Sequence, residues 1–192
     1  MPHKTIDFNK IFESDKIRLR PLCRDDKDAF TVMTRDKDLW IYFTSDLSDP
    51  EILTQWVEDA INGFRNKTRL ALTIIDSVNN QIIGSTSLGN ISVRDQRVEM
   101  GWTWIRKDYQ GKGINRQAKY LLLQYCFEEL NLERVEFKTD VLNKAARKSL
   151  LGIGAIEEGI LRSHTLMTHN RRRDTIFYSI LKAEWELMRS GQ

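Results

Sequence analysis

The chain has 192 residues and a mass of 22.5 kDa; 41% of its residues are hydrophobic, 30% are charged, and the net charge is +3. This composition excludes a disordered chain, and the nearly balanced charges give no field over the whole surface that would favour a nucleic acid. A chain of this length buries one sizeable core, so we expect one domain over residues 1–192, with its core at about 16–182 and a short extension at 1–12.

Two features exclude further classes of protein. Cys23 and Cys126 lie far apart in the sequence and lack the paired spacing of a zinc or redox site, so we expect both thiols to be buried and reduced, and no metal to be bound. No stretch approaches the ~20 apolar residues of a membrane span, and residues 1–8 contain no apolar run of signal-peptide length. The sequence therefore predicts a cytoplasmic protein without a membrane partner.

The first part of the chain predicts one strand and two helices. Residues 16–22 alternate charged and apolar side chains, which is the pattern of a strand with one buried face. Residues 25–35 form a short amphipathic pattern. Residues 49–51, Asp-Pro-Glu, then supply an N-cap, a first-turn proline and a first-turn acid for a second helix, whose apolar residues recur every three or four positions as far as Phe64.

Three strands follow. Residues 70–75 and 82–88 predict a hairpin, because the turn at 78–81 contains two asparagines, which adopt positive backbone angles readily. A polar loop is expected at 89–96, and residues 97–105 predict the next strand because they are rich in tryptophan and β-favouring residues.

The second half predicts strands that alternate with helices. Residues 117–130 indicate the longest helix, because they have no internal glycine or proline, and residues 134–141 alternate as a strand does. Asn143 is a plausible cap for a helix that runs through Ile153 and that Gly154 closes.

The last elements are two strands at 157–165 and 174–181, separated by a basic loop at 168–173, and a terminal helix at about 183–188. The order of elements predicts an α/β (α+β) domain: a mixed, mostly antiparallel central sheet of about seven strands, flanked by helices, with later strands joined by strand–helix–strand crossovers.

One segment suggests chemistry. Gly111 and Gly113 lie where a strand meets the longest helix, so the backbone there can approach a bulky anion, and the free N–H groups of the helix would face it. Lys112 and Arg116 add cations nearby. Alone, the pattern fits a tight turn as well as a phosphate site. It is neither a Walker loop nor a dinucleotide fingerprint, because Gly113 follows Lys112 and Arg116 replaces the third glycine.

This segment resembles the cofactor loop of the GNAT N-acetyltransferases, which reads Gln/Arg-x-x-Gly-x-Gly/Ala at a strand–helix junction. Gln110, Gly113 and Asn115 occupy those positions, and Asn115 departs from the family at the last one. The family's second mark is an Asn after the next strand and a Gly about eleven residues later, which Asn143 and Gly154 match.

The order of elements resembles the family over about residues 16–181, and residues 99–162 look most similar to the branch of the ribosomal-protein N-terminal acetyltransferases. The resemblance implies acetyl-coenzyme A as the acyl donor, a splayed strand pair that admits it, and an amine as acceptor. Among amines, a protein N-terminus is the easier nucleophile, because α-amines lose their proton at about pH 8 and lysines at about pH 10. Related enzymes are often dimers, so a homodimer stays open.

By resemblance, the cofactor would contact the loop and the next strand pair. Trp102, Trp104 and Ile105 would pair their backbone with the pantetheine arm, and Asn143 would bind near it. The diphosphate would be held by Gln110, Gly111, Lys112, Gly113, Ile114, Asn115 and Arg116.

Three residues are candidates for catalysis. Glu99 lies directly before the cofactor strand, where apolar neighbours could raise its pKa and suit it as a base; a solvated or ion-paired carboxylate is the simpler interpretation. Many relatives place a tyrosine acid seven positions after the conserved Asn, but this chain has Leu150 there. Ser149 and Tyr178 are the alternatives, although packing of the helix and the strand explains both more simply.

Two other functions stay open. The missing tyrosine at Leu150 suggests a noncatalytic acetyl-CoA sensor. Residues 171–173, three consecutive arginines, suggest an RNA- or ribosome-associated binding module, although the chain lacks the interleaved aromatic and basic residues of a stacking surface. For these arginines a solvated hairpin loop is the simpler interpretation, since three adjacent charges cannot all face one surface.

Overall fold

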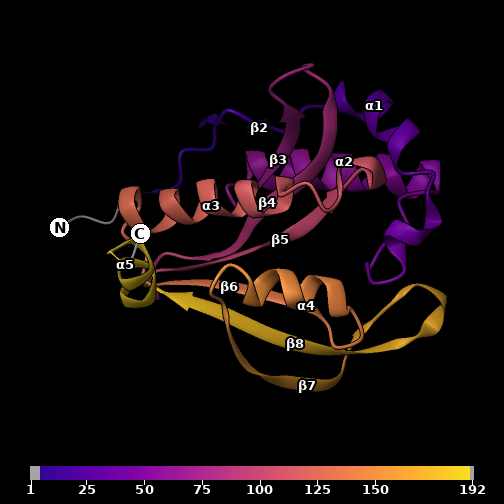
Figure 1. Ribbon diagram of the computed structural model, residues 1–192. Helices are drawn as coiled ribbons and strands as arrows, with labels where there is room; N and C mark the ends of the chain where they lie inside the picture. Colours follow the sequence, from indigo (N-terminus) through magenta and orange to yellow (C-terminus); the bar gives the residue numbers. More distant parts are fainter. Residues whose placement is uncertain (1–4, 191–192) are drawn as a thin grey trace.

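The computed structural model describes residues 5–190, so residues 1–4 of the expected extension and residues 191–192 of the expected domain lie outside the described part. Eight strands form one sheet in the order β1-β2-β3-β4-β5-β6-β8-β7 (Figure 1). The strands are β1 (Phe12–Glu13), β2 (Ile17–Pro21), β3 (Arg69–Asp76), β4 (Ile82–Ser92), β5 (Arg97–Ile105), β6 (Arg134–Asp140), β7 (Ile156–Leu166) and β8 (Arg172–Leu181).

Neighbouring strands are antiparallel except β5 and β6, which are parallel. The mixed, mostly antiparallel sheet is therefore confirmed, with eight strands in place of about seven. The additional strand is β1, which has only two residues, too few for an alternating pattern to appear in the sequence. β4 extends to Ser92, so the loop expected at 89–96 is shorter than predicted, and the hairpin turn before it contains Asn80 at a φ of 56°.

The helices are α1 (Asp26–Met33), α2 (Pro50–Arg65), α3 (Ile114–Gln124), α4 (Lys144–Leu151) and α5 (Lys182–Ser190). The Asp49 side chain caps α2 as expected, accepting from the backbone N–H of Glu51 at 2.8 Å. α3 begins three residues before the predicted start, because Gly113, at a φ of 81°, turns the chain directly into the helix. The helix continues as a π-helical turn over Tyr125–Glu129.

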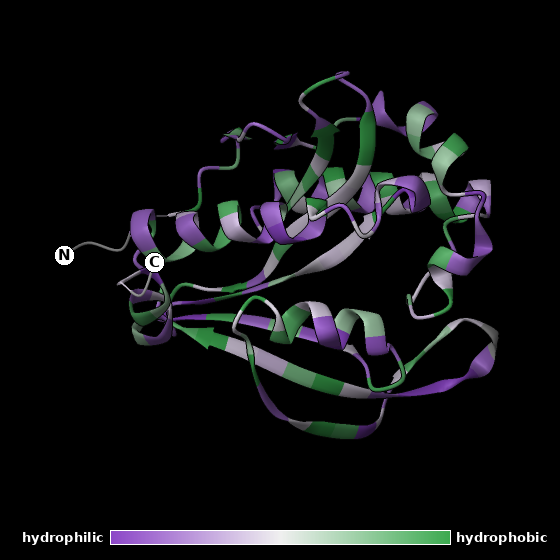
Figure 2. Cartoon of the chain, viewed as in Figure 1, coloured by the Kyte–Doolittle hydropathy of each residue, from purple (hydrophilic) through white to green (hydrophobic). Residues whose placement is uncertain are grey.

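The two faces of the sheet carry different helices. Leu70 and Leu72 of β3 pack in the core under α3, whereas Ala71 between them packs in a second core under α1 and α2. This alternation is the period of a strand. In Figure 1, α3 and α4 cross in front of the sheet and α2 lies behind it; in Figure 2 the loop between β7 and β8 is largely hydrophilic.

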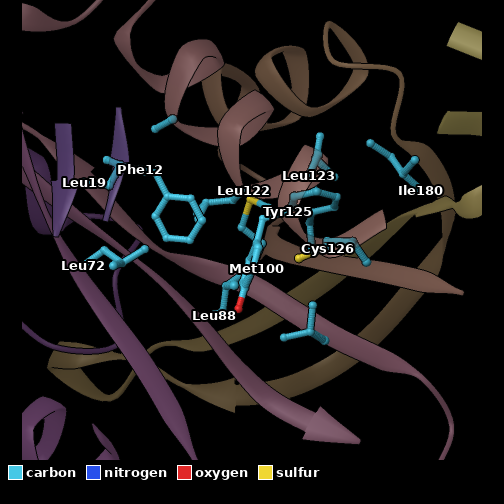
Figure 3. Close-up of a cluster of buried hydrophobic side chains, with 14 of the residues drawn as sticks. Phe12, Leu19, Leu72, Leu88, Met100, Leu122, Leu123, Tyr125, Cys126 and Ile180 are labelled. Carbon is cyan, nitrogen blue, oxygen red and sulfur yellow. The ribbon is translucent and has the colours of Figure 1, made fainter. Parts of the chain in front are cut away.

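The core under α3 is the larger one, and Figure 3 shows part of it. Phe12 of β1 contacts Tyr125 edge-on in it, with ring centroids 5.1 Å apart. Cys126 is fully buried there, as predicted, and burial raises the pKa of its thiol. Cys23 is exposed instead, because it lies in the turn between β2 and α1; the expectation that both thiols are buried was wrong for it.

β5 changes its alternation halfway. Between Gly101 and Trp104 it has one residue more than the facing segment of β4, and Trp102, at a φ of 52°, occupies this bulge. A slip of one residue turns all later side chains to the other face. Trp104 therefore packs in the second core, on the ring of Phe30 at 5.0 Å between centroids.

Candidate functional site

β5 and β6 separate at one end of the sheet. They pair only where residues 97–99 face residues 134–136, and beyond Glu99 they diverge (Figure 1). This is the splayed pair that the family resemblance implied. From Met100 to Ile105 the edge of β5 that faces β6 has no strand partner within the described residues. The Ile105 carbonyl accepts from the Gln110 side chain, and the unpaired backbone groups before it are available to another molecule.

A cavity of about 180 Å³ lies between the diverging strands. Its lining comes from both faces of the sheet, so the cavity passes through the gap. The residues on the side of α3 and α4 include Asn115, Lys119, Asn143, Ala146, Ser149 and Leu150. Those on the opposite side or in the gap include Tyr42, Phe43, Thr44, Glu99, Trp102, Lys138 and Arg173.

The glycine segment forms the entrance to α3. Gly111 and Gly113 both have positive φ, 73° and 81°, and no atom lies within 4 Å of the position a Cβ would take at either residue. Gln110 fixes the loop to the end of β5, because its Nε2 donates to the carbonyl of Ile105 at 2.9 Å. The loop is therefore held at one end and open toward solvent.

The first turn of α3 offers free donors. The backbone N–H of Gln117 donates to the carbonyl of Gly113 at 2.9 Å, and no side chain caps the helix. The preceding N–H groups, from Ile114 to Arg116, therefore have no acceptor inside the helix. A helix N-terminus with such donors carries about half a positive charge and favours an anion. The Lys112 Nζ lies over the Tyr109 ring, 5.2 Å from its centroid, and Arg116 is exposed.

Two asparagines line the cavity beside α3 and α4. The Nδ2 of Asn115 donates to the Oγ of Ser149 at 3.1 Å and so joins α3 to α4. The Oδ1 of Asn115 is buried and has no hydrogen-bond partner, which leaves an acceptor for a ligand donor. Asn143 caps α4, as its place in the sequence suggested, since its Oδ1 accepts from the N–H of Ala146 at 3.0 Å.

Glu99 lies at the point where the strands part. It is 6% exposed, and its Oε2 accepts from the Nδ2 of Asn90 at 2.7 Å and pairs with the Nζ of Lys138 at 2.9 Å. The apolar surroundings expected for this carboxylate are therefore not found. The side chain instead lines the cavity as an ion-paired group, on the face opposite α3.

Trp102 is the one residue of the three cofactor-strand candidates whose side chain lines the cavity. Its ring stacks with the guanidinium of Arg69, 4.8 Å from the ring centroid, and this guanidinium also lies over Trp56. The side chains of Trp104 and Ile105 are buried in the two cores. The role that the resemblance gives these residues concerns their backbone, but Trp104 pairs with Ser85 of β4 and the Ile105 carbonyl already accepts from Gln110.

Tyr178 lies away from the cavity. Its hydroxyl accepts from the Nε of Arg147 at 3.1 Å and donates to Glu157 at 3.2 Å, and its side chain is fully buried. It does not line the cavity between the strands. The side chain of Tyr178 is thus held by an arginine and a glutamate from neighbouring elements.

The arginine run is not a solvated loop. Arg172 and Arg173 belong to β8, and Arg171 pairs with the buried Asp140. Arg173 is 6% exposed, lines the cavity, and donates its Nε to the Oγ1 of Thr175 at 3.0 Å; burial lowers the pKa of its guanidinium. The interpretation as a solvated hairpin failed because consecutive strand residues point to opposite faces.

Lys119 is the cavity residue that the sequence analysis missed. It lies one turn after Asn115 on α3, is 6% exposed, and has its Nζ 5.8 Å from the centroid of the Phe137 ring. Burial lowers the pKa of its ammonium from 10.5 to about 8. A signal existed, because Lys119 interrupts the buried stripe of α3 that Ala118 and Leu122 belong to.

Two kinds of feature are absent from residues 5–190. No cluster of three or more histidine, cysteine, aspartate or glutamate side chains is placed to hold a metal ion in that range. None of the helices described there is both long and apolar enough to span a lipid bilayer.

Comparisons with known proteins agree with one another. Residues 16–156 match the family model of the acetyltransferase (GNAT) domain. The chain is 39% identical over 105 residues to the "Putative ribosomal N-acetyltransferase YdaF" of Bacillus subtilis (strain 168); the match covers 55% of this chain and 56% of that relative. It is 26% identical over 177 residues to the uncharacterized N-acetyltransferase p20 of Bacillus licheniformis, covering 90% of this chain and 96% of the relative.

Among solved structures, a GCN5-related N-acetyltransferase from Brucella melitensis has the same fold, with a TM-score of 0.88 at 22% identity. The superposition covers 98% of this chain and 86% of that one. At this identity, the similarity concerns the fold alone.

Proposed function

This chain belongs to the GNAT family of acetyltransferases, and we propose that it transfers the acetyl group of acetyl-coenzyme A directly to a primary amine. The observation that carries the proposal is the cavity between β5 and β6, which is lined from both faces of the sheet. An acyl donor that enters from the side of α3 and an acceptor amine that enters from the opposite side can be bound in such a gap at the same time, as direct transfer requires.

The side of α3 suits the donor. Open space at Gly111 and Gly113 and the free N–H groups of the first turn fit a diphosphate, with Lys112 and Arg116 nearby. The unpaired Oδ1 of Asn115 and the open edge of β5 fit an arm that carries amide donors and acceptors. We propose that Gln110 to Arg116, the backbone from Trp102 to Ile105, and Asn143 hold this cofactor.

Direct transfer needs a base, a donor to the carbonyl oxygen and an acid for the leaving thiolate. Bound acetyl-CoA supplies an activated acetyl thioester. Glu99, which lines the cavity, accepts the proton of the amine, directly or through a water. Backbone N–H groups of β5 beyond Glu99 polarise the carbonyl, and the Ser149 hydroxyl lines the same cavity. Tyr178 has no part in this proposal.

The acceptor we propose is a protein N-terminal α-amine. Its pKa of about 8 leaves far more neutral amine at pH 7 than a lysine side chain offers. The name of the Bacillus subtilis relative assigns a ribosomal target to that protein, which supports the choice. The cytoplasmic location expected from the sequence is part of the same proposal.

The test uses radiolabelled acetyl-CoA and a panel of amines: peptides with free N-termini from ribosomal proteins, the same peptides blocked at the N-terminus but carrying a lysine, and a polyamine. We expect label in the free N-terminal peptides. Calorimetric binding of acetyl-CoA without transfer to any acceptor would identify a sensor. Salt-sensitive RNA binding without affinity for acetyl-CoA would identify a nucleic-acid module.

A further inference from the structure

Lys119 is a buried cation that the fold does not use. It is 6% exposed on α3, in a row of residues that otherwise pack the core. Among residues 5–190, its Nζ makes no hydrogen bond or ion pair, and it lies 5.8 Å from the centroid of the Phe137 ring. A lysine buried to this extent without a partner for its charge costs folding free energy, so packing alone does not explain it.

The charged groups around the same cavity do not neutralise Lys119. Glu99 of β5 pairs with Lys138 of β6 at 2.9 Å, and Arg173 of β8 donates to a threonine hydroxyl. α4 contributes only uncharged side chains to the lining, among them Ser149. Glu99 is therefore engaged by another lysine, and the cavity has room for a negative charge beside Lys119.

The position of Lys119 fits the departing sulfur. It lies one helical turn after Asn115, on the face of the sheet from which the cofactor enters, whereas Glu99 lies on the opposite face. A base and an acid on the two sides of a gap are the arrangement that acyl transfer needs, because the amine arrives on one side and the thiolate leaves on the other. Leu150, which lines the wall of α4, is apolar and cannot supply a proton.

We propose that the Lys119 ammonium is the general acid that protonates the thiolate of coenzyme A, which rests on the acetyl transfer proposed above. As the amine nitrogen forms its bond to the acetyl carbon, the carbon–sulfur bond breaks and its electron pair stays on sulfur. Lys119 gives one proton to that sulfur and becomes a neutral amine. The acceptor amine loses one proton to Glu99. Water then carries a proton from Glu99 to Lys119, so the enzyme neither gains nor loses a proton overall.

Ser149 is the competing donor on the same side of the cavity. Its Oγ already accepts a hydrogen bond from Asn115, and its own proton is free to reach a ligand. A hydroxyl is a far weaker acid than an ammonium whose pKa burial lowers to about 8, close to the pH at which the enzyme would work. Lys119 therefore gives proton transfer the larger driving force, and Ser149 keeps the role of orienting the site.

The test measures the acid group without turnover. Coenzyme A is bound to the wild type, to Lys119→Met, to Lys119→Arg and to Ser149→Ala, and ultraviolet absorbance of the thiolate is followed against pH in each complex. In the wild type the bound thiol is expected to ionise at lower pH than free coenzyme A, because the ammonium stabilises the thiolate. The shift should disappear in Lys119→Met and remain in Lys119→Arg and Ser149→Ala.

Steady-state kinetics then separate charge from proton transfer. We expect kcat to fall about 10²- to 10⁴-fold in both Lys119→Met and Lys119→Arg, since an arginine keeps the charge but releases its proton poorly, with KM for acetyl-CoA nearly unchanged. The decline of kcat above about pH 8 should be absent from both variants. Lys119→Gln serves if Lys119→Met does not fold.

Three results would overturn the proposal. If Lys119→Met binds coenzyme A with the same thiol pKa as the wild type, Lys119 does not face the sulfur. If Lys119→Arg retains full kcat, Lys119 acts as a fixed charge and not as an acid. If the folded wild type binds no coenzyme A at all, the acetyl transfer itself is wrong, a result that is distinct from the first two.

Discussion

The Nζ of Lys138 lies 2.9 Å from the Oε2 of Glu99, and this ion pair joins β6 to β5 at the last residue where the two strands still face each other. Asn90 of β4 holds the same carboxylate oxygen at 2.7 Å. The Glu99 carboxylate is therefore fixed at the inner end of the gap. Its position does not depend on the segments of β5 and β6 that lie beyond their last paired residues.

Replacing Glu99 with Gln tests its role as the base. The amide keeps an oxygen that can accept from Asn90 but cannot take a proton from the amine, so kcat at neutral pH should fall about 10²- to 10⁴-fold. Affinity for coenzyme A, measured by calorimetry, should stay unchanged. Glu136→Gln is the matched control, because Glu136 pairs with Arg97 and Arg134 one strand away and does not line the cavity. Turnover equal to the wild type in Glu99→Gln would remove this residue from the mechanism.

Gly113→Ala should weaken cofactor binding more than it weakens the fold. Alanine at a φ of 81° costs about 1–2 kcal/mol of stability, and the added methyl enters open space at the entrance to α3, where the diphosphate is proposed to lie. Gly159→Ala on β7 is the control, since Gly159 also has positive φ, 152°, and open surroundings. Urea denaturation should show a loss in both variants, and calorimetry a loss of coenzyme A affinity only in the first; equal affinity in both would place the diphosphate elsewhere.

Lys119→Met should stabilise the free protein near neutral pH. Burial lowers the pKa of Lys119 from 10.5 to about 8, so at pH 7 the folded protein carries an unfavourable charge that costs about 3 kcal/mol. Between about pH 8 and 10.5 the unfolded chain binds a proton that the folded one lacks, so the wild type gains stability as pH rises and the advantage of the variant shrinks. Guanidinium unfolding at pH 7 and pH 10 measures this; a pH-independent difference would contradict it.

Asp26→Asn should destabilise the protein by about 3 kcal/mol, because it breaks a charge pair whose carboxylate is buried and leaves the partly buried Arg20 guanidinium without its anion. Burial raises the pKa of the Asp26 carboxyl, but hydrogen bonds from Arg20 and Thr73 outweigh burial and hold the pKa below its ordinary value of 3.8. The stability that this carboxylate adds is therefore present above pH 3.8 and is lost as pH falls through the lower, folded value.

The exposed pair of Arg24 and Glu58 provides the comparison for Asp26. The Nη2 of Arg24 lies 2.8 Å from the Oε2 of Glu58, the same distance as between Arg20 Nη1 and Asp26 Oδ2. Water screens the exposed pair, however. Glu58→Gln should therefore leave the urea midpoint unchanged at pH 7. A shift as large as that of Asp26→Asn would mean that burial does not decide the strength of these pairs.

Local patterns in the sequence were sufficient for most elements. The β-favouring composition of residues 97–105, the Asp49 cap and the glycine turn before α3 act through neighbours a few positions away, and each lies where the sequence predicted. The sequence analysis missed β1 because its two residues are ordered by pairing with β2. The expectation for Cys23 was wrong because exposure in a turn has no periodic pattern in the sequence.

The cavity depended on contacts that no local pattern encodes. The sequence by itself determined the order of the strands and helices along the chain apart from β1, the glycine loop and, through its motifs, the family, since backbone propensities and side-chain periodicity act over short separations. Only the tertiary structure decided that Lys138 would pair with Glu99, that Arg173 would be buried, and that Lys119 would line the gap without a partner. These outcomes follow from where β5 and β6 separate, and that point is set by packing between residues far apart in the chain.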